Sequence, residues 1–326
     1  MPDFWHQPHH LMRRLCLPLS LLYHALHRLR WMVRRPARLP VPVLCVGNLV
    51  AGGAGKTPTV LALVTLLQQH GRTPHVLSRG YGGSVRTATR VTTTHSAEEM
   101  GDEPLLLAQY APCWVGRNRV ATATCAIKAG ADCLVMDDGF QNPSLHKDVS
   151  LLVIDGGYGI GNGAVMPAGP LRETVTSACQ RAQAVLIIGR DVTGCLSRFP
   201  RNLHFLRGQI TATIPETWQK HNTPLIAFCG IGRPAKFYDT LKAAALTLVA
   251  THDFPDHHPY RDADLQALYD EAQAHDATLI TTEKDWMRLS EPWRARVHYV
   301  PITLDIQPRT TLEQLLTHHA ILERAE

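Results

Sequence analysis

Apolar residues occur in short continuous runs that alternate with mixed polar and apolar stretches through the first two thirds of the 326-residue chain. The runs predict strands at 41–46, 74–78, 113–115, 133–136, 150–154 and 184–188. The stretches between them predict helices at 56–69, 104–110, 118–129 and 176–181. Continuous apolar strands that alternate with helices are typical of a parallel sheet covered on both faces. We therefore predict a doubly wound α/β fold.

A second set of elements follows a boundary. The alternation loosens after about residue 210, and the segment 215–224 has a proline at each end. Beyond it the pattern predicts strands at 225–229, 246–251, 278–281 and 297–301, with helices at 235–244, 262–275 and 311–324. We expect an N-terminal segment at 1–37, a large α/β domain at 38–214 and a smaller α/β domain at 215–326. A substrate is expected in the cleft between the two domains.

The N-terminal segment is both apolar and basic. Its longest stretch without Lys or Arg is 13 residues, which is shorter than the roughly 20 needed to cross a bilayer. A signal peptide would need a small-x-small cleavage site, and none follows. Five leucines stand at helical spacing, and arginines surround them: Leu15, Leu19, Leu22, Leu26 and Leu29, with Arg13, Arg14, Arg28, Arg30, Arg34 and Arg35. We favour a helix that lies in a membrane surface; the alternative is a leucine-rich helix packed on the protein's own core.

Charge is distributed unevenly, although the net charge is only +5. The stretch between Phe4 and Ala97 holds no acidic residue and 12 Lys or Arg. This asymmetry predicts an anionic partner, which can be a phosphate-bearing ligand, nucleic acid or a membrane surface. A hydrophobic content of 45% excludes disorder and rod-like architectures. The 8 cysteines form no C-x-x-C pair, which favours reduced thiols over a disulfide or zinc framework.

A glycine-rich run follows the first predicted strand and opens a helix: Gly52, Gly53, Ala54, Gly55, Lys56 and Thr57. Glycines let backbone N–H groups turn around phosphate oxygens, while the lysine reaches the β- and γ-phosphates and the threonine hydroxyl reaches Mg²⁺. The strict phosphate-loop pattern has glycine where this chain has Val50, so the run is a variant loop. The alternative is a glycine-rich turn without function. We predict nucleotide binding in a P-loop NTPase-like domain.

Two neighbouring carboxylates support this interpretation. Asp137 and Asp138 end the predicted strand 133–136, where a Walker-B acid would hold Mg²⁺ directly or through water. An ordinary Asp-Asp-Gly turn is the alternative. The loop also resembles that of cell-division and partition ATPases, which carry an additional lysine where this chain has Ala51. A membrane-bound regulatory ATPase with a protein partner is therefore the second candidate.

Kinase chemistry also needs a proton acceptor and cations for the transferring phosphoryl group. Asp102 and Glu103 precede a proline that suits a first helical turn, so helix capping is the alternative role for them. Arg117 and Arg119 are candidate cations. In the second domain His257 and His258 lie in a loop rich in acids and prolines. We prefer proton handling for this loop over a metal site, because no second His or Cys cluster stands at ligand spacing; a plain surface loop is the alternative.

Seven short motifs occur in one order along nearly the whole chain. They are Val46-Gly47-Asn48-Leu49 with the loop through Pro58, Leu77-Ser78-Arg79-Gly80-Tyr81-Gly82, Gly101-Asp102-Glu103-Pro104, Asp137-Asp138-Gly139-Phe140-Gln141, Met166-Pro167-Ala168-Gly169-Pro170-Leu171-Arg172-Glu173, Phe254-Pro255-Asp256-His257-His258 and Thr282-Glu283-Lys284-Asp285. Together they resemble the tetraacyldisaccharide 4'-kinases, the lipid A 4'-kinases of Gram-negative bacteria. Val50 fits the loop of that family.

The resemblance implies a reaction, a location and partners. It implies transfer of phosphate from ATP to the 4'-hydroxyl of an acylated glucosamine disaccharide 1-phosphate, with Mg²⁺, at the cytoplasmic face of the inner membrane. The implied fold is two α/β/α domains joined by a short strand linker, with an N-terminal helix on the membrane. Neither nucleic acid nor an obligate protein partner is expected.

The resemblance also implies residue roles. Lys56 and Thr57 would bind phosphates and Mg²⁺, with the other residues of the loop 52–57 around the phosphates. Asp137 and Asp138 would be the Walker-B acids. Asp102 would be the catalytic base, supported by His257 rather than His258. Three more residues would organise metal and phosphate: Glu103, Arg119 and Gln141.

Overall fold

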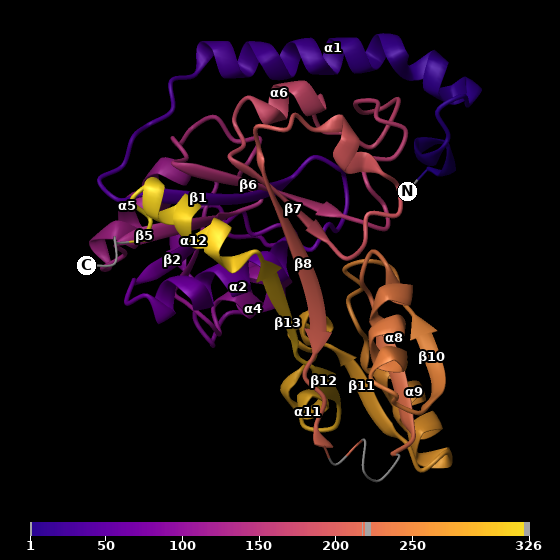
Figure 1. The fold of residues 1–326 in the computed structure, drawn as a ribbon. Coiled ribbons are helices and arrows are strands. Elements are labelled where there is room, and N and C mark those ends of the chain that lie inside the picture. Colours follow the sequence, from indigo (N-terminus) through magenta and orange to yellow (C-terminus); the bar gives the residue numbers. More distant parts are fainter. Residues whose placement is uncertain (1, 217, 219–222, 323–326) are drawn as a thin grey trace.

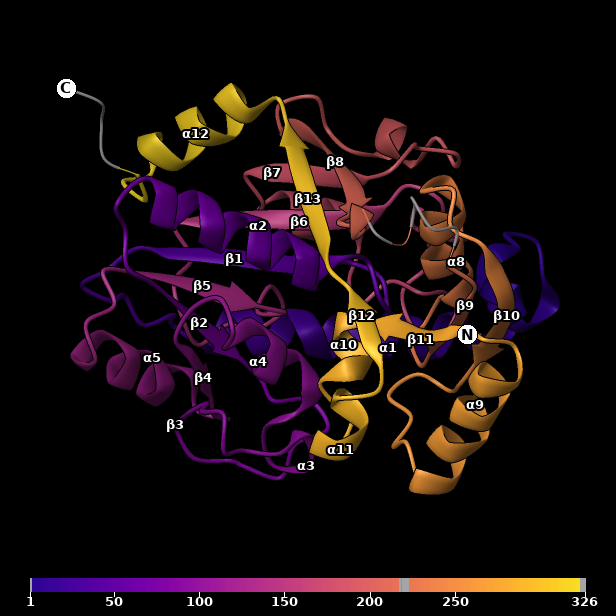
Figure 2. The same cartoon turned by 90° about the horizontal axis from the view of Figure 1, so that it is seen from below.

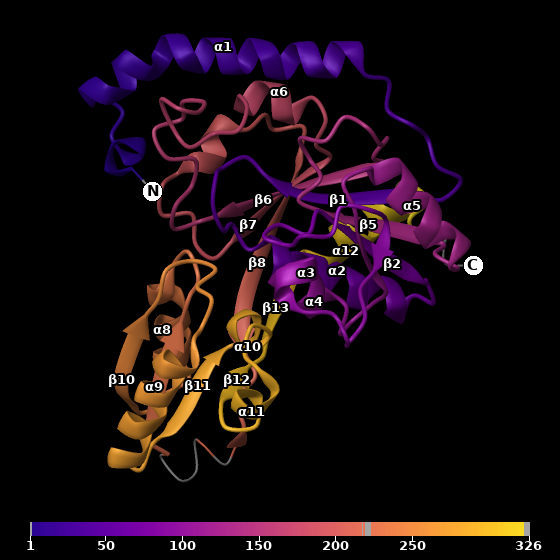
Figure 3. The same ribbon diagram turned by 180° about the vertical axis from the view of Figure 1, so that it is seen from behind.

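The computed structural model describes residues 2–216, 218 and 223–322. Parts of two sequence predictions lie outside these residues, namely the middle of the boundary segment 215–224 and the last two positions of the helix predicted at 311–324. The described chain folds around two sheets of unequal size (Figure 1). A long N-terminal helix lies on the outside of the larger unit, above α6 (Val175–Cys179), in Figures 1 and 3.

The described residues of the larger unit form a nine-stranded sheet in the order β13-β8-β7-β6-β1-β5-β2-β4-β3. Its strands are β1 (Val43–Asn48), β2 (Pro74–Ser78), β3 (Thr89–Arg90), β4 (Cys113–Val115), β5 (Cys133–Asp137), β6 (Val149–Asp155), β7 (Ala184–Ile188), β8 (His204–Ala212) and β13 (Ile302–Gln307). The strands from β8 to β4 pair in parallel, and the two edge strands β13 and β3 pair antiparallel. This arrangement confirms the doubly wound sheet predicted from the sequence.

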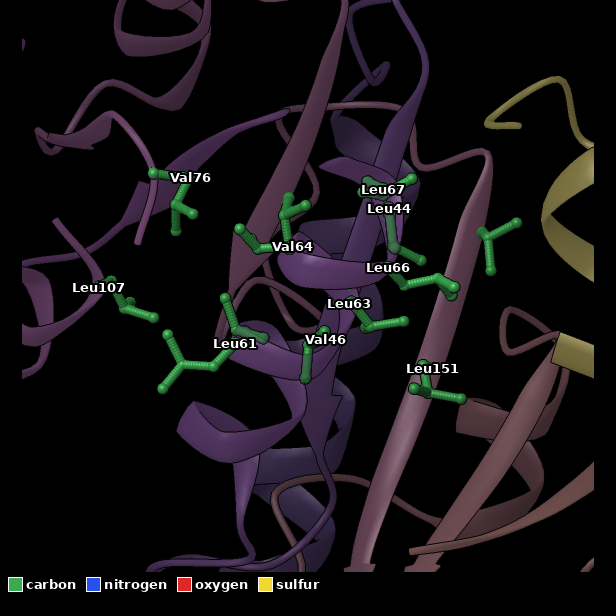
Figure 4. Packing of buried hydrophobic residues seen from close by; sticks show 14 of the residues in the cluster. Leu44, Val46, Leu61, Leu63, Val64, Leu66, Leu67, Val76, Leu107 and Leu151 are labelled. Carbon is green, nitrogen blue, oxygen red and sulfur yellow. The ribbon is translucent and has the colours of Figure 1, made fainter. Parts of the chain in front are cut away.

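Helices cover both faces of this sheet, which explains the continuous apolar strands. One face carries α2 (Lys56–Gln69), α4 (Asp102–Leu107) and α12 (Arg309–His318), and the other carries α5 (Arg119–Lys128) and α6 (Val175–Cys179). Within β1, Leu44 and Val46 belong to the first core and Val43 and Cys45 to the second, as the period of two in a strand requires. Figure 4 shows Leu44 and Val46 beside the apolar residues of α2.

The smaller unit holds a four-stranded parallel sheet in the described part of the chain, in the order β10-β9-β11-β12. The strands are β9 (Leu225–Cys229), β10 (Leu248–Asp253), β11 (Thr278–Thr282) and β12 (His298–Val300). Helix α8 (Pro234–Ala243) packs on one face and α9 (Asp262–Ala274) on the other. The remaining short helices are η1 (Asp3–His6), α3 (Ala97–Met100), α10 (Glu283–Trp286), α11 (Glu291–Arg294) and η2 (Cys195–Arg198).

The chain returns to the larger unit at its end. β13 pairs with β8 from Ile302 opposite Ala212 to Gln307 opposite Arg207, and α12 packs on the same sheet. The pair β8 and β13 runs between the two units in Figures 1 and 2. The sequence-based division at residue 215 puts β13 and α12 in the smaller domain, but their pairing and packing attach both to the large sheet.

Helix α1 spans Leu11–Val33 and contains Pro18. Many of its large apolar side chains are exposed, and Leu22 and Leu26 each keep 58% of their surface in contact with solvent. No helix within the described ranges is long and apolar enough to cross a bilayer. The outer face of α1 therefore exposes large apolar side chains to solvent.

Candidate active site

A cleft of about 580 Å³ opens between the two units. Its walls on the larger unit are the loop 51–58 and the ends of β2, β5 and β6. On the smaller unit they are the segment 231–237 at the start of α8, the loop at 256–257 and the residues 282–284. Ligands of doubly wound proteins bind outside the carboxyl ends of the parallel strands. The cleft has this position, and it holds most of the residues singled out from the sequence.

The loop 52–57 links β1 to α2 and is held in a left-handed conformation at two glycines. Gly52 has φ 109° and Gly55 has φ 88°, values that side chains other than glycine rarely adopt. A Cβ atom at Gly55 would also collide with the side chain of Ile188. The Asn48 amide donates to the carbonyl oxygens of Val50 at 2.7 Å and Gly52 at 3.0 Å. Contacts within the chain therefore hold the loop in this conformation.

Lys56 and Asp138 meet at one side of this loop. The Lys56 Nζ atom lies 3.8 Å from Asp138 Oδ1, and Arg172 Nη1 donates to the same oxygen at 2.8 Å. Burial favours the neutral form of Asp138, but the charges of Lys56 and Arg172 outweigh it and hold the pKa of this carboxyl below its usual range. Asp138 is thus an ionised carboxylate beside the loop.

Asp137 is the more buried of the two carboxyls. Its Oδ2 accepts from Ser78 Oγ at 3.4 Å, while its Oδ1 has no hydrogen-bond partner among the described residues. Burial, followed by the negative charges of Glu103 and Asp138, raises the pKa of Asp137 well above its usual range. A buried carboxyl oxygen without a partner, next to further carboxylates, is the environment that a bound cation would relieve.

The donor set fits Mg²⁺. This ion prefers oxygen ligands, takes one or two carboxylates and keeps phosphate oxygens and waters as its other ligands. The residues that line the cleft on this side are Thr57, Glu103, Asp137 and Asp138. Within the described ranges no group of three or more His, Cys, Asp and Glu side chains is placed so that it could hold a metal ion by itself.

Asp102 stands at the start of α4 and joins the two units. Its side chain is only 5% exposed. Its Oδ1 accepts from the Glu103 backbone N–H at 2.9 Å, which is a bond to a free N–H group of the helix as in the capping alternative. Its Oδ2 faces the smaller unit, where it accepts from Arg288 Nε at 2.8 Å and also from Arg288 Nη2, and lies 3.1 Å from His257 Nδ1.

Cations surround Asp102. The Lys284 Nζ atom lies 3.7 Å from Asp102 Oδ2 and donates to Glu103 Oε1 at 3.1 Å. Burial opposes ionisation of Asp102, but the hydrogen bond to His257 and the charges of Lys284 and Arg288 outweigh burial and hold its pKa well below the usual range. Asp102 is therefore ionised at neutral pH.

The two adjacent histidines have different surroundings. His257 has φ 60° and lines the cleft, between Asp102 and the ring of Tyr81, whose centroid is 5.6 Å away. His258 instead lies 3.1 Å from Asp264 Oδ2 and packs against Phe254. The fold brings His257 to Asp102 and turns His258 towards α9.

Arg119 and Gln141 lie behind the cleft and are not among the described residues that line it. Arg119 is 4% exposed and donates to the backbone carbonyls of Ser78 and Gly116. Gln141 Nε2 donates to the carbonyl oxygen of Asn48 at 3.0 Å. Arg119 thus holds the ends of β2 and β4, and Gln141 holds the end of β1.

Several residues of the site were not predicted from the sequence, or were given no role there. Lys284 and Arg172 fall inside quoted motifs, so their position carried a signal. Arg288 carried none, because its partner Asp102 is 186 positions away in sequence. Asp155 is a further case: it ends β6 and pairs with Lys236 and, at 2.8 Å, with Arg233 of the smaller unit.

The sequence matches the profile of one protein family, LpxK, described as tetraacyldisaccharide-1-P 4'-kinase, over residues 12–320. The chain belongs to this family. It is 47% identical over 320 residues to the tetraacyldisaccharide 4'-kinase of Rhodospirillum centenum, covering 97% of this chain and 95% of that one. It is 50% identical over 304 residues to the enzyme of the same name from Gluconacetobacter diazotrophicus, covering 93% and 92%.

A solved structure of the same family has the same fold. The crystal structure of "apo" form LpxK from Aquifex aeolicus in complex with ATP superposes with a TM-score of 0.79 at 25% sequence identity, and covers 95% of this chain and 99% of that one. The family, the fold class and the enzyme class predicted from the sequence are confirmed.

Proposed function

We propose that this chain transfers the γ-phosphate of ATP to the 4'-hydroxyl of a tetraacylated glucosamine disaccharide 1-phosphate, the step that gives the 4'-phosphorylated lipid A precursor. The observation that carries this proposal is the composition of the cleft. A phosphate loop with Lys56 and Asp138 forms one wall, and His257, which is backed by the ionised carboxylate of Asp102, lines the same cleft. Phosphoryl transfer needs these two parts in one enclosed space.

The nucleotide would lie along the loop 52–57. Backbone N–H groups and Lys56 would receive its phosphates, as in other phosphate loops. Thr57, Asp137, Asp138 and Glu103 would hold Mg²⁺, which supplies positive charge to the β- and γ-phosphate oxygens when bound. Arg172, which already contacts Asp138, would add a cation near the transferring group.

The pair Asp102 and His257 would accept the proton of the attacking hydroxyl. His257 lines the cleft, whereas Asp102 contacts His257 from behind, so the imidazole is the group that meets the acceptor. Asp102 stabilises the positive charge that the imidazole gains, a general role of carboxylates behind histidine. Arg119 would act as a positioning residue for the end of β2, and Gln141 for the loop, rather than as direct contacts of ATP.

The two units and α1 would each have a separate role. We propose a peripheral helix at 1–37, a nucleotide-binding unit at 38–214 together with 302–322, and a smaller unit at 215–301 that closes the acceptor side. The outward leucines of α1, with Leu22 and Leu26 among them, and its arginines suit an anionic membrane surface. An acylated substrate resides in such a surface, so the cytoplasmic face of the inner membrane is the proposed location.

The proposal is tested by ATP consumption with and without the acylated disaccharide 1-phosphate in mixed micelles. We expect ADP release that depends on the lipid, and a Lys56→Met variant without this activity. ATP consumption that is independent of the lipid, and that responds instead to an added protein, would support the second candidate, a regulatory ATPase.

A further inference from the structure

The segment 165–173 lies between α1 and the phosphate loop. On the loop side its backbone pairs with the residues that enter the loop: Ala51 N–H donates to Pro170 O at 2.9 Å, and Arg172 N–H donates to Leu49 O at 2.7 Å. Val50 and Leu171 form a bridge between these hydrogen bonds. A displacement of this segment would therefore move the entry to the loop.

On its other side the same segment is held by α1. Ser20 is buried although most of α1 is exposed. Its hydroxyl donates to Val165 O at 2.8 Å and accepts from Ala168 N–H at 3.0 Å. A buried hydroxyl that satisfies one carbonyl and one N–H fixes the register of helix against segment.

A second connection starts near the end of α1. The guanidinium of Arg181 lies over the ring of Trp31 at 4.3 Å and donates to both carboxylate oxygens of Glu173, at 2.8 and 2.6 Å. His27 accepts from Trp31 Nε1 at 3.1 Å and lies 3.7 Å from Glu173 Oε2. Glu173 is fully buried, so the charge and the position of this carboxylate depend on α1 and Arg181.

Glu173 leads directly to the nucleotide side of the cleft. Gln141 Nε2 is shared between Glu173 Oε1 at 3.3 Å and the Asn48 carbonyl at 3.0 Å. The next residue in sequence, Arg172, donates to Asp138 at 2.8 Å. Ser20, His27 and Trp31 are spaced by seven and four residues and so share one face of α1, while Leu22, Leu26 and Leu29 lie exposed.

We propose that α1 is a positioning element of the nucleotide site, through Ser20, His27 and Trp31, in addition to any contact it makes with lipid. Its inward face fixes the segment 165–173, and the segment fixes the phosphate loop and Arg172. The inference deepens the proposed function and rests on it for the identity of the nucleotide. Helix α1 thereby couples the attachment of its outward face to a membrane surface with the binding of ATP.

The test compares Trp31→Ala with Met32→Ala, its neighbour on α1 that is 80% exposed. The dissociation constant of a non-hydrolysable ATP analogue with Mg²⁺ is measured by calorimetry without lipid or detergent. We expect Trp31→Ala to weaken analogue binding about tenfold, and Met32→Ala to leave it unchanged. A loss of about tenfold is the lower end of the effect seen when a residue that holds a ligand-binding side chain in place is removed. In the micelle assay Trp31→Ala should raise KM for ATP and leave KM for the acylated disaccharide unchanged.

Three further variants guard against misfolding. Ser20→Ala and His27→Gln are small changes, and a Trp31→Phe variant that keeps the ring under Arg181 should restore most of the binding lost in Trp31→Ala. Analogue binding equal to wild type in Ser20→Ala, His27→Gln and Trp31→Ala, all folded by circular dichroism, would overturn the proposal. Analogue binding is read without the lipid, so a wild-type protein that binds the analogue but phosphorylates no lipid contradicts the proposed function alone.

Discussion

Replacing Asp102 by asparagine removes one negative charge from the junction of the two units while keeping the shape of the side chain. Asp102 Oδ2 accepts from Arg288 Nε at 2.8 Å and contacts His257 Nδ1 at 3.1 Å. The variant therefore loses the group that stabilises a protonated His257, and it leaves Arg288 with Asp285 as its remaining carboxylate at 2.7 Å.

The size of both effects follows from the geometry. A positioned acid or base contributes about 10²- to 10⁴-fold to the rate, so we expect kcat of Asp102→Asn to fall by about that factor with KM for ATP little changed. Removing one partner of a buried ion pair costs about 3–5 kcal/mol. Because Asp285 still pairs with Arg288, and Glu103 with Lys284, the loss of stability should lie near the lower limit, about 3 kcal/mol. Alanine is the poorer test, because it also creates a cavity.

The assay is transfer of labelled phosphate from ATP to the acylated disaccharide, with thermal unfolding of the same protein samples. Asp256→Asn is the matched control: Asp256 Oδ1 lies 3.8 Å from His257 Nε2, but its side chain is 47% exposed. It should retain stability, and its turnover should fall far less than that of Asp102→Asn. A folded Asp102→Asn protein with turnover close to that of the wild type would refute the assigned role of Asp102.

Four further predictions follow from the site and from α1. Lys56→Ala should lower phosphate transfer by about 10²-fold or more, with little change in the thermal midpoint because Asp138 keeps Arg172 as a partner at 2.8 Å. Chelation by EDTA should abolish transfer, and added Mg²⁺ should restore it; activity that survives chelation would contradict the metal assignment. The double variant Leu22→Asp and Leu26→Asp should lose binding to anionic vesicles at unchanged stability, since both side chains already face water; flotation assays decide this. For Glu173, burial raises the pKa, but the contact with His27 and the charge and hydrogen bonds of Arg181 outweigh burial and hold the pKa below its ordinary value of 4.5. A carboxyl with a depressed pKa stabilises the fold above that value and ceases to do so as the pH falls. Glu173→Gln should therefore be less stable than wild type in urea at neutral pH, and the difference should shrink below pH 4.5. The charged or titratable groups that face Glu173 are His27, Lys147, Cys179 and Arg181.

Local patterns sufficed for the centre of the large sheet and for one wall of the cleft. β1, the loop 52–57 and α2 are contiguous, so strand, glycines, lysine and helix can be read from a single stretch of sequence. The strands β8 and β13 were missed because the prediction rested on continuous apolar runs, whereas the residues of both strands alternate between buried and exposed positions. Their antiparallel pairing at the edge of the large sheet joins distant segments, and the identity of the partner strand has no local signal.

The other wall of the cleft is built from contacts between distant segments. Arg288 meets Asp102 across 186 positions, and no local spacing encodes such a contact. His257 and His258 are equivalent in sequence, and only the positive φ of His257 together with the packing of His258 on Phe254 separates them. For α1 the sequence left two alternatives, a surface helix or a helix packed on the core. Ser20 and Trp31 contact the protein while Leu22 is exposed, so features of both are present.

The most direct measurement of the central claim is the product formed from purified protein, Mg²⁺, ATP and tetraacylated disaccharide 1-phosphate. Mass spectrometry of the lipid gives the phosphate gained, phosphorus and carbon resonances give its position, and ADP is quantified in the same reaction. We predict one additional phosphate on the 4'-oxygen for each ADP released. ADP without a phosphorylated lipid, or phosphate at another position, would contradict the account.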